Sequence, residues 1–196
     1  MPALSGLRII DFSRFLPGAY GSWVAADMGA DVIRVEHPRE LAKQAAMATP
    51  PAPGNGADGG DGGDGGGGRA DDGAARQRAR PSYMRNKRSI AINPGVPASR
   101  AVLAPLIASA DVVIEDYRPG VMAAMGYGAE ALCAAHPRLI YLSVSFAGQT
   151  GPLAGAVGHD PAALALAGAL AGLNGTTTPT LPGLQVADTL AGAHAT

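Results

Sequence analysis

The feature that most constrains the fold is an alternation of β-branched runs with apolar helical segments. Residues 7–12 and 31–36 are short runs rich in Val, Leu and Ile, and the apolar segment 19–28, which Gly29 ends, lies between them. A strand, a helix and a strand within about 30 residues make a βαβ unit, whose parallel strands are buried on both faces. The first part of the chain therefore predicts an α/β fold with an open parallel sheet.

The same order returns in the second half of the chain. Predicted strands cover residues 88–92, 111–115 and 138–146, and predicted helices cover residues 98–109 and 120–135. The chain has 196 residues, enough for one domain or for part of a larger one. We therefore predict a Rossmann-like open parallel sheet flanked by helices.

Residues 50–80 interrupt this pattern as a glycine-rich insertion. Ten of the fifteen residues from 54 to 68 are glycine, so the segment has no apolar surface to offset the entropy of ordering it. We predict a flexible insertion. Three aspartates spaced by three suggest calcium, but the repeat lacks the apolar positions and the number of turns of a β-roll, so no metal site is predicted.

Charge is concentrated in one stretch. The formal net charge of −1 argues against a nucleic-acid-binding protein, yet seven of the fifteen Lys and Arg residues lie within residues 69–88. Arg85, Lys87 and Arg88 lead directly into a predicted strand, and such rigidly supported cations suit phosphate oxygens. The alternatives are a solvated basic face, or nucleic-acid binding, for which interleaved aromatic residues apart from Tyr83 are missing.

Three observations favour a cytoplasmic protein. The single cysteine, Cys133, cannot form an internal disulfide and suits a reducing compartment. The first residues show no basic segment followed by an apolar one, as a secretory signal would. The longest apolar run, residues 161–173, is shorter than the roughly 20 residues that a membrane span needs. We therefore expect no membrane partner.

His159 and Asp188 are the candidates for chemistry. His159 precedes the apolar run 162–173, and Asp188 closes the run 184–188 before a second apolar segment. A rigid fold could place this imidazole and this carboxylate across a cleft. The structural alternatives are a His159 ring bonded to a backbone carbonyl and an Asp188 that caps a helix. Capping is compatible with catalysis, because a helix N-terminus stabilises a carboxylate.

Six blocks of the sequence occur in an order typical of a known enzyme family. The chain resembles the family III CoA-transferases of the CaiB/BaiF type, which include formyl-CoA and carnitine CoA-transferases and α-methylacyl-CoA racemase. The resemblance covers the chain except residues 41–80, and it specifies the family more closely than the reaction. The blocks are residues 4–8, 17–18, 27–36, 85–89, 111–120 and 148–152.

The resemblance implies a CoA-thioester enzyme with a Rossmann-like CoA-binding domain. CoA thioester is then a substrate, and no tightly bound cofactor is expected. A nicotinamide cofactor is rejected because the Gly-x-Gly-x-x-Gly turn is absent after the first strand. By matched position, Arg34 should lie near the adenine, Arg85, Lys87 and Arg88 near the CoA phosphates, and Tyr117, Arg118 and Gly120 along the pantetheine channel.

The resemblance leaves two reactions open. In the transferases the residue matching Asp188 attacks the thioester, and in the racemase the residues matching His159 and Asp188 exchange the α-proton of an acyl-CoA as two bases. Residues 161–163 depart from the racemase pattern and residues 189–194 are closer to the transferases, so the transferase is favoured. An inactive CoA-binding module is the alternative of another class.

Family members are about twice as long as this chain. We therefore expect an N-terminal part, residues 1–196, with the C-terminal half and a small domain missing. The resemblance implies an interlocked homodimer for the full-length protein, with acyl-CoA and carboxylate molecules as partners. Little or no turnover is expected from the isolated chain.

Overall fold

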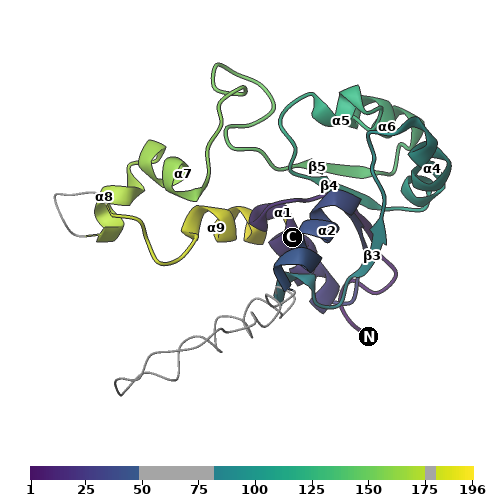
Figure 1. Ribbon diagram of the computed structural model, residues 1–196, viewed down its shortest axis with the longest axis horizontal. Coiled ribbons are helices and arrows are strands. Elements are labelled where there is room, and N and C mark those ends of the chain that lie inside the picture. The colour runs from purple at the N-terminus through teal and green to yellow at the C-terminus, as the bar shows by residue number, and fades with distance from the viewer. Residues whose placement is uncertain (49–81, 175–179) are drawn as a thin grey trace, which may run out of the picture.

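A computed structural model describes residues 1–48, 82–174 and 180–196, and within them five parallel strands form one sheet with helices on both faces (Figure 1). This confirms the predicted Rossmann-like α/β class. The predicted insertion, residues 50–80, lies outside the described residues. The strands are β1 (Arg8–Asp11), β2 (Asp31–Glu36), β3 (Arg88–Ala91), β4 (Val112–Glu115) and β5 (Ile140–Ser143).

The strand order is β3-β2-β1-β4-β5, so the chain starts in the middle of the sheet. It first builds outward through β2 to β3, and then returns to the other side of β1 to add β4 and β5. The direction of winding therefore reverses between β1 and β4. In open α/β sheets, ligands bind in the crevice at the carboxyl ends of the strands beside such a reversal.

The helices of the sheet region differ from the expectation in two places. The predicted helix 120–135 is wrong as a single element, because Gly126 at φ +85° separates α5 from α6. The helix α2 was not expected after Pro38, although proline suits a first helical position. The elements are α1 (Leu16–Asp27), α2 (Pro38–Ala48), η1 (Ser82–Met84), η2 (Pro97–Ser99), α4 (Arg100–Ala108), α5 (Val121–Ala124) and α6 (Ala129–Ala135).

Apolar side chains cover both faces of the sheet. Successive residues of a strand point to opposite faces, so Ile9 and Ile10 of β1 enter different clusters. Ile10 packs in the cluster that contains Leu103 and Ile107 of α4. Ile9 lies in the cluster built on Ala25, Ala26 and neighbouring aliphatic residues, where small side chains let α1 approach closely. Across the described ranges, no helix is long and apolar enough to cross a membrane.

The last part of the chain returns to the sheet region through three helices. These are α7 (Asp160–Leu166), α8 (Ala169–Asn174) and α9 (Val186–His194). Gly168 at φ +70° separates α7 from α8, so the apolar run 162–173 does not form one helix. In Figure 1, α7 and α8 extend to one side, while α9 packs against α1.

The contact between α9 and α1 depends on Gly192. A Cβ atom added there would lie 2.7 Å from the carbonyl oxygen of Pro17 and 2.8 Å from Cβ of Tyr20. We expect Gly192→Ala to lower the free energy of unfolding by about 1–3 kcal/mol in denaturant titrations, because the two helices must separate. Gly172→Ala in α8 is the control, since no atom lies within 4 Å of its added Cβ. Equal stability of the two variants would contradict this packing.

Candidate active site

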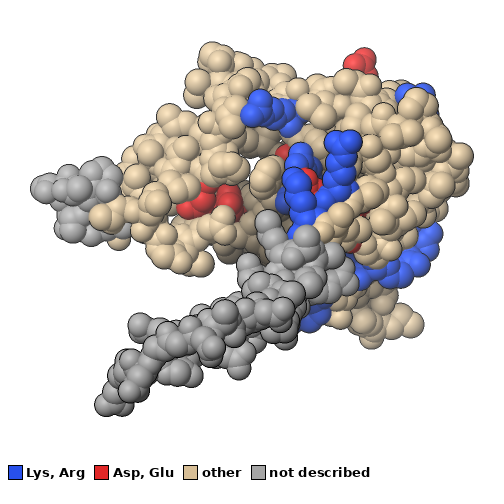
Figure 2. Space-filling model, in the orientation of Figure 1, with Lys and Arg blue, Asp and Glu red and all other residues tan. Residues whose placement is uncertain are grey.

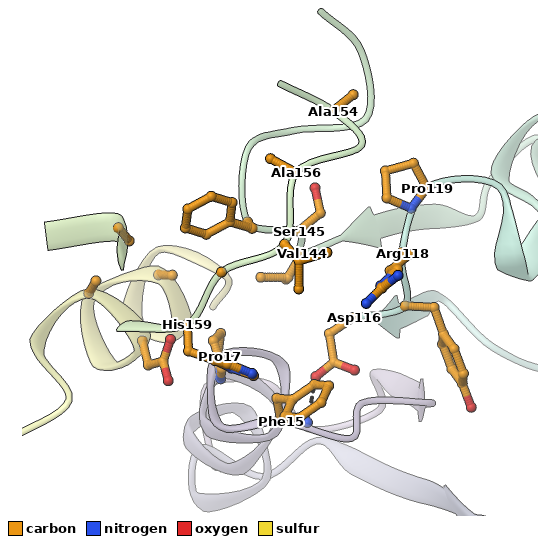
Figure 3. A pocket seen from close by; sticks show the side chains of 18 residues that line it. Phe15, Pro17, Asp116, Arg118, Pro119, Val144, Ser145, Ala154, Ala156 and His159 are labelled. Atoms are coloured by element: carbon orange, nitrogen blue, oxygen red, sulfur yellow. Dashed lines mark hydrogen bonds between the residues drawn. The ribbon is translucent and has the colours of Figure 1, made fainter. Parts of the chain in front are cut away.

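A cavity of about 250 Å³ lies at the carboxyl ends of β1, β4 and β5, where the winding of the sheet reverses (Figure 3). The segments after these strands form one side of the cavity, and the loop before α7 and the start of α9 form the other. Most of the lining is apolar, including Phe15, Val144 and Phe146. The polar lining residues are Asp116, Tyr117, Arg118, Ser145, His159 and Asp188.

His159 and Asp188 line this same cavity. His159 is the N-cap residue of α7, with an extended backbone at φ −125° and ψ −179°. Its ring contacts the ring of Phe15 edge-on, with 5.5 Å between the centroids. Within the described part of the chain its ring accepts or donates no hydrogen bond, so the expected alternative of a ring bonded to a backbone carbonyl is not observed.

Asp188 lies in the first turn of α9, and Gln185 is the N-cap residue. The expectation that Asp188 itself caps the helix is therefore wrong, although the first turn still favours a carboxylate. Gln185 Nε2 donates a hydrogen bond to Asp188 Oδ2 at 3.0 Å. Burial and the nearby Asp160 raise the pKa of Asp188, and His159 and the Gln185 hydrogen bond oppose the rise.

Asp160 joins the two helix starts that carry these residues. Its side chain is buried, and its Oδ1 accepts a hydrogen bond from the backbone N–H of Asp188 at 2.9 Å. Asp160 directly follows His159, so one carboxylate ties the start of α7 to the first turn of α9. Sequence reasoning missed this contact, because it joins residues 28 positions apart.

The predicted pantetheine residues lie on the segment after β4. The backbone N–H of Tyr117 donates to Glu115 Oε2 at 2.8 Å, and the Arg14 guanidinium lies 5.6 Å from the centroid of the Tyr117 ring. Burial raises the pKa of Tyr117. Arg118 lies on the cavity wall in Figure 3, and Gly120 at φ +85° makes the turn into α5.

Asp116 lies on the same wall of the cavity, and sequence reasoning did not single it out. Its Oδ1 accepts the backbone N–H of Arg14 at 2.7 Å, and its Oδ2 accepts that of Phe15 at 2.8 Å. Burial raises the pKa of Asp116 to about 7, although both N–H groups lower it. The sequence signal was that Asp116 directly follows a predicted strand, and that Arg14 and Phe15 lie just beyond another.

A second cavity, of about 150 Å³, lies beside the carboxyl ends of β1 and β2. It shares Phe15 and Tyr117 with the larger cavity, and Arg34 is part of its lining. The Arg34 guanidinium is buried, 3.7 Å from Asp11 Oδ2 and 3.5 Å from Glu36 Oε1. The structure thus places the predicted adenine residue next to the cavity that holds His159 and Asp188.

The structure does not bring Arg85, Lys87 and Arg88 together. The Lys87 side chain is 1% exposed, and its Nζ lies 3.1 Å from Asp11 Oδ2 and donates to Ser22 Oγ and the Ala19 carbonyl, both at 2.7 Å. Its ammonium group therefore points into the protein between β1 and α1.

Arg85 and Arg88 lie at the amino ends of the strands, whereas the cavities lie at the carboxyl ends. Arg85 pairs with Asp27 at the end of α1 and covers the Trp23 ring, and Arg88 pairs with Asp31 at the start of β2. Figure 2 shows Lys and Arg side chains in separate groups on the face in view. Within the described residues, no cluster of three or more His, Cys, Asp or Glu could hold a metal ion.

Comparison with known proteins places the chain in one family. Residues 4–196 match CoA-transferase family III. Human succinyl-CoA:glutarate CoA-transferase is 33% identical over 194 residues, which cover 98% of this chain and 39% of that protein. The alpha subunit of succinyl-CoA–L-malate CoA-transferase from Chloroflexus aurantiacus is 35% identical over 185 residues, which cover 92% of this chain and 38% of that protein.

Solved structures agree with this match. A hypothetical protein from Mycobacterium tuberculosis is 27% identical, with a TM-score of 0.72 over 100% of this chain and 48% of that chain. A CaiB/BaiF family protein from Brucella suis is 28% identical, with a TM-score of 0.68 over 98% and 47% of the two chains. The chain thus spans less than half the length of these four proteins. Because sequence and fold match over nearly all of it, the chain belongs to CoA-transferase family III.

Proposed function

We propose that Asp188 is the nucleophile of an enzyme that moves CoA from an acyl-CoA thioester to a carboxylic acid. The observation that carries this proposal is the position of the Asp188 carboxylate in a family III chain. It lies half-buried on a mostly apolar cavity, where the winding of the sheet reverses. The names of the relatives contain succinyl-CoA, glutarate and L-malate, so we propose short dicarboxylic acids as the substrate class.

The proposed reaction proceeds in four acyl transfers at Asp188. An Asp188 oxygen attacks the thioester carbonyl, the C–S bond breaks, and CoA thiolate leaves a mixed anhydride. The thiolate then attacks the aspartyl carbonyl and releases the donor acid, which leaves CoA on Asp188. The acceptor carboxylate attacks this thioester and forms a second anhydride. The released thiolate attacks the acceptor's carbonyl, which gives the new acyl-CoA and restores the Asp188 carboxylate.

The two neighbouring cavities suggest how CoA would lie. We place the thioester in the larger cavity beside Asp188 and the adenine in the smaller cavity beside Arg34, with pantetheine along Tyr117, Arg118 and Gly120. For the CoA phosphates, the geometry supports Arg14 better than Arg85 and Arg88. The Arg14 guanidinium borders the smaller cavity and has no acidic partner among the described residues, whereas the other two are ion-paired at the amino ends of the strands.

The exposed surface supports a partner for this chain. Leu166, Leu181 and Leu184, near α7 and α9, are 66%, 76% and 65% exposed. Apolar residues that gather on one side of a protein often mark an interface. We propose that the enzyme is an interlocked homodimer located in the cytoplasm.

Oxygen labelling tests the nucleophile directly. The protein, expressed from its complete reading frame, is incubated with an acyl-CoA and an acceptor whose carboxylate carries ¹⁸O. Each turnover should leave one ¹⁸O atom on Asp188, because the second anhydride breaks at the acceptor's carbonyl. Mass spectrometry of the peptide that contains Asp188 measures this gain. Transfer of CoA without ¹⁸O in that peptide would reject the aspartyl intermediate.

A racemase is the second candidate, because His159 lines the cavity with Asp188 as a two-base mechanism requires. It predicts deuterium at the α-carbon when a chiral 2-methylacyl-CoA is incubated in deuterated water without an acceptor. Transfer to an added carboxylate without α-exchange would leave His159 a supporting role. Binding of CoA with neither reaction would indicate a CoA-binding module.

A further inference from the structure

The Asp116 carboxylate links the segments that follow β1 and β4, the two strands between which the winding of the sheet reverses. Arg14 and Phe15 follow β1, and Asp116 follows β4, the strand that pairs with β1. Each carboxylate oxygen accepts one backbone N–H, from Arg14 at 2.7 Å and from Phe15 at 2.8 Å. Phe15 is also the N-cap residue of α1 and has no side-chain cap of its own. One carboxylate therefore holds two consecutive residues of the link between β1 and α1.

Phe15 extends this contact to the candidate catalytic histidine. Its ring meets the His159 ring edge-on at 5.5 Å between centroids, and both line the larger cavity. The Arg14 guanidinium lies over the rings of Phe15 and Tyr117, 5.7 Å and 5.6 Å from their centroids. In Figure 3, Asp116, Phe15 and His159 follow one another along the cavity. The His159 ring makes no hydrogen bond within the described residues, so Phe15 is the evident support of that ring.

We propose that Asp116 is a positioning residue whose ionised carboxylate holds Phe15 against His159, and whose protonation loosens this contact. An ionised carboxylate accepts at both oxygens, whereas a protonated one turns a donor O–H toward one of the two N–H groups. Protonation therefore removes one of the two bonds to residues 14 and 15. The effect on catalysis, though not the contact itself, rests on the proposed function.

The surroundings of Asp116 place this change near neutral pH. Burial raises the pKa of Asp116 to about 7. The N–H groups of Arg14 and Phe15 lower it, Asp11 raises it and Arg34 lowers it. Because this pKa is raised to about 7, the two-bond form is complete well above pH 7 and is lost as the pH falls through that value. The other ionisable side chains on the cavity are Tyr117, Arg118, His159 and Asp188.

Fluorine labelling can follow Phe15, because the chain has three phenylalanines and therefore gives three signals. They belong to Phe12, Phe15 and Phe146. In protein labelled with 4-fluorophenylalanine, we expect the Phe15 ¹⁹F signal to shift with a midpoint near the pKa of Asp116. Asp116→Asn should abolish this midpoint. His159→Gln should keep it, which separates Asp116 from titration of the neighbouring imidazole.

The opposite pattern would overturn the proposal. A midpoint that survives Asp116→Asn and vanishes in His159→Gln would assign the shift to the histidine. The signal of Phe12, which is buried, reports whether Asp116→Asn still folds. If the Asp116→Asn variant does not fold, ¹³C labelling of aspartate carboxyl groups in the unaltered protein tests the proposal. The Asp116 carboxyl and the Phe15 signal must then share one midpoint, and two different midpoints would refute the link.

Kinetics of the protein from its complete reading frame test the effect on catalysis. Asp116→Asn and Phe15→Leu should each lower kcat about 10- to 100-fold, because His159, which lowers the pKa of the Asp188 nucleophile, loses its support. The double variant should lose no more than the worse single one, because both changes break one chain of contacts. A Phe15→Leu variant with full kcat would overturn the positioning role. Absence of CoA transfer by the unaltered protein would instead reject the proposed function and leave the NMR result standing.

Discussion

Replacing Asp188 with asparagine is expected to reduce CoA transfer by about 10⁴-fold or more. An amide lacks the carboxylate oxygen that would attack the thioester, and it cannot carry CoA through an anhydride. Its size is nearly that of aspartate, and the backbone N–H that bonds Asp160 is unchanged. The rate of formation of the new acyl-CoA measures the effect. Binding of free CoA should change little.

Glu130→Gln provides the matched control for this change. It also converts a carboxylate to an amide in the first turn of a helix, α6, but its side chain is exposed and lies outside both cavities. It should keep the full transfer rate. An Asp188→Asn variant as active as this control would refute the nucleophile and require another residue on the cavity.

Lys87→Met is expected to lower the free energy of unfolding by about 3–5 kcal/mol. Asp11 is completely buried and forms an ion pair with Lys87 Nζ at 3.1 Å. Removing the ammonium group leaves this carboxylate with the more distant Arg34, at 3.7 Å, as its ion-pair partner among the described residues, and Ser22 Oγ and the Ala19 carbonyl each lose one donor. Equilibrium unfolding in denaturant, followed by circular dichroism, measures the loss.

The adjacent residue offers a control with the same change of chemistry. Arg88→Met also breaks an ion pair with an aspartate, but the Arg88 side chain is 63% exposed. Such a surface pair contributes about 1 kcal/mol or less. A Lys87→Met variant that stays stable and loses affinity for CoA would instead support the phosphate-binding role predicted from the sequence.

Local patterns were sufficient to predict most of the elements. Runs of β-branched residues marked strands because they suit a pleated, buried surface, and the repeated strand–helix order predicted the parallel sheet. The errors also have local causes. The glycines at 126 and 168 adopt positive φ, which ends a helix even where apolar residues continue. Pro38 ended a predicted strand, but it also began α2.

The residues of the candidate site also differ in whether local sequence could predict them. His159 and Asp188 could be singled out because each lies where one kind of local structure changes into another, and because the family resemblance marks both. Asp116 and Phe15 could not, because their contact depends on β1 and β4 lying side by side, although about a hundred residues separate them. Strand order is a property of the whole chain, and nothing in the local sequence shows which strands become neighbours.

The basic residues at the start of β3 and just before it show the difference most clearly. The sequence by itself determined the α/β class, the family and the two candidate catalytic residues, since these depend on local patterns and on ordered motifs. Only the tertiary structure decided that Lys87 enters the core while Arg85 and Arg88 remain at the amino ends of the strands. Neighbouring residues of an extended chain point in opposite directions, so closeness in sequence does not gather their charges at one site.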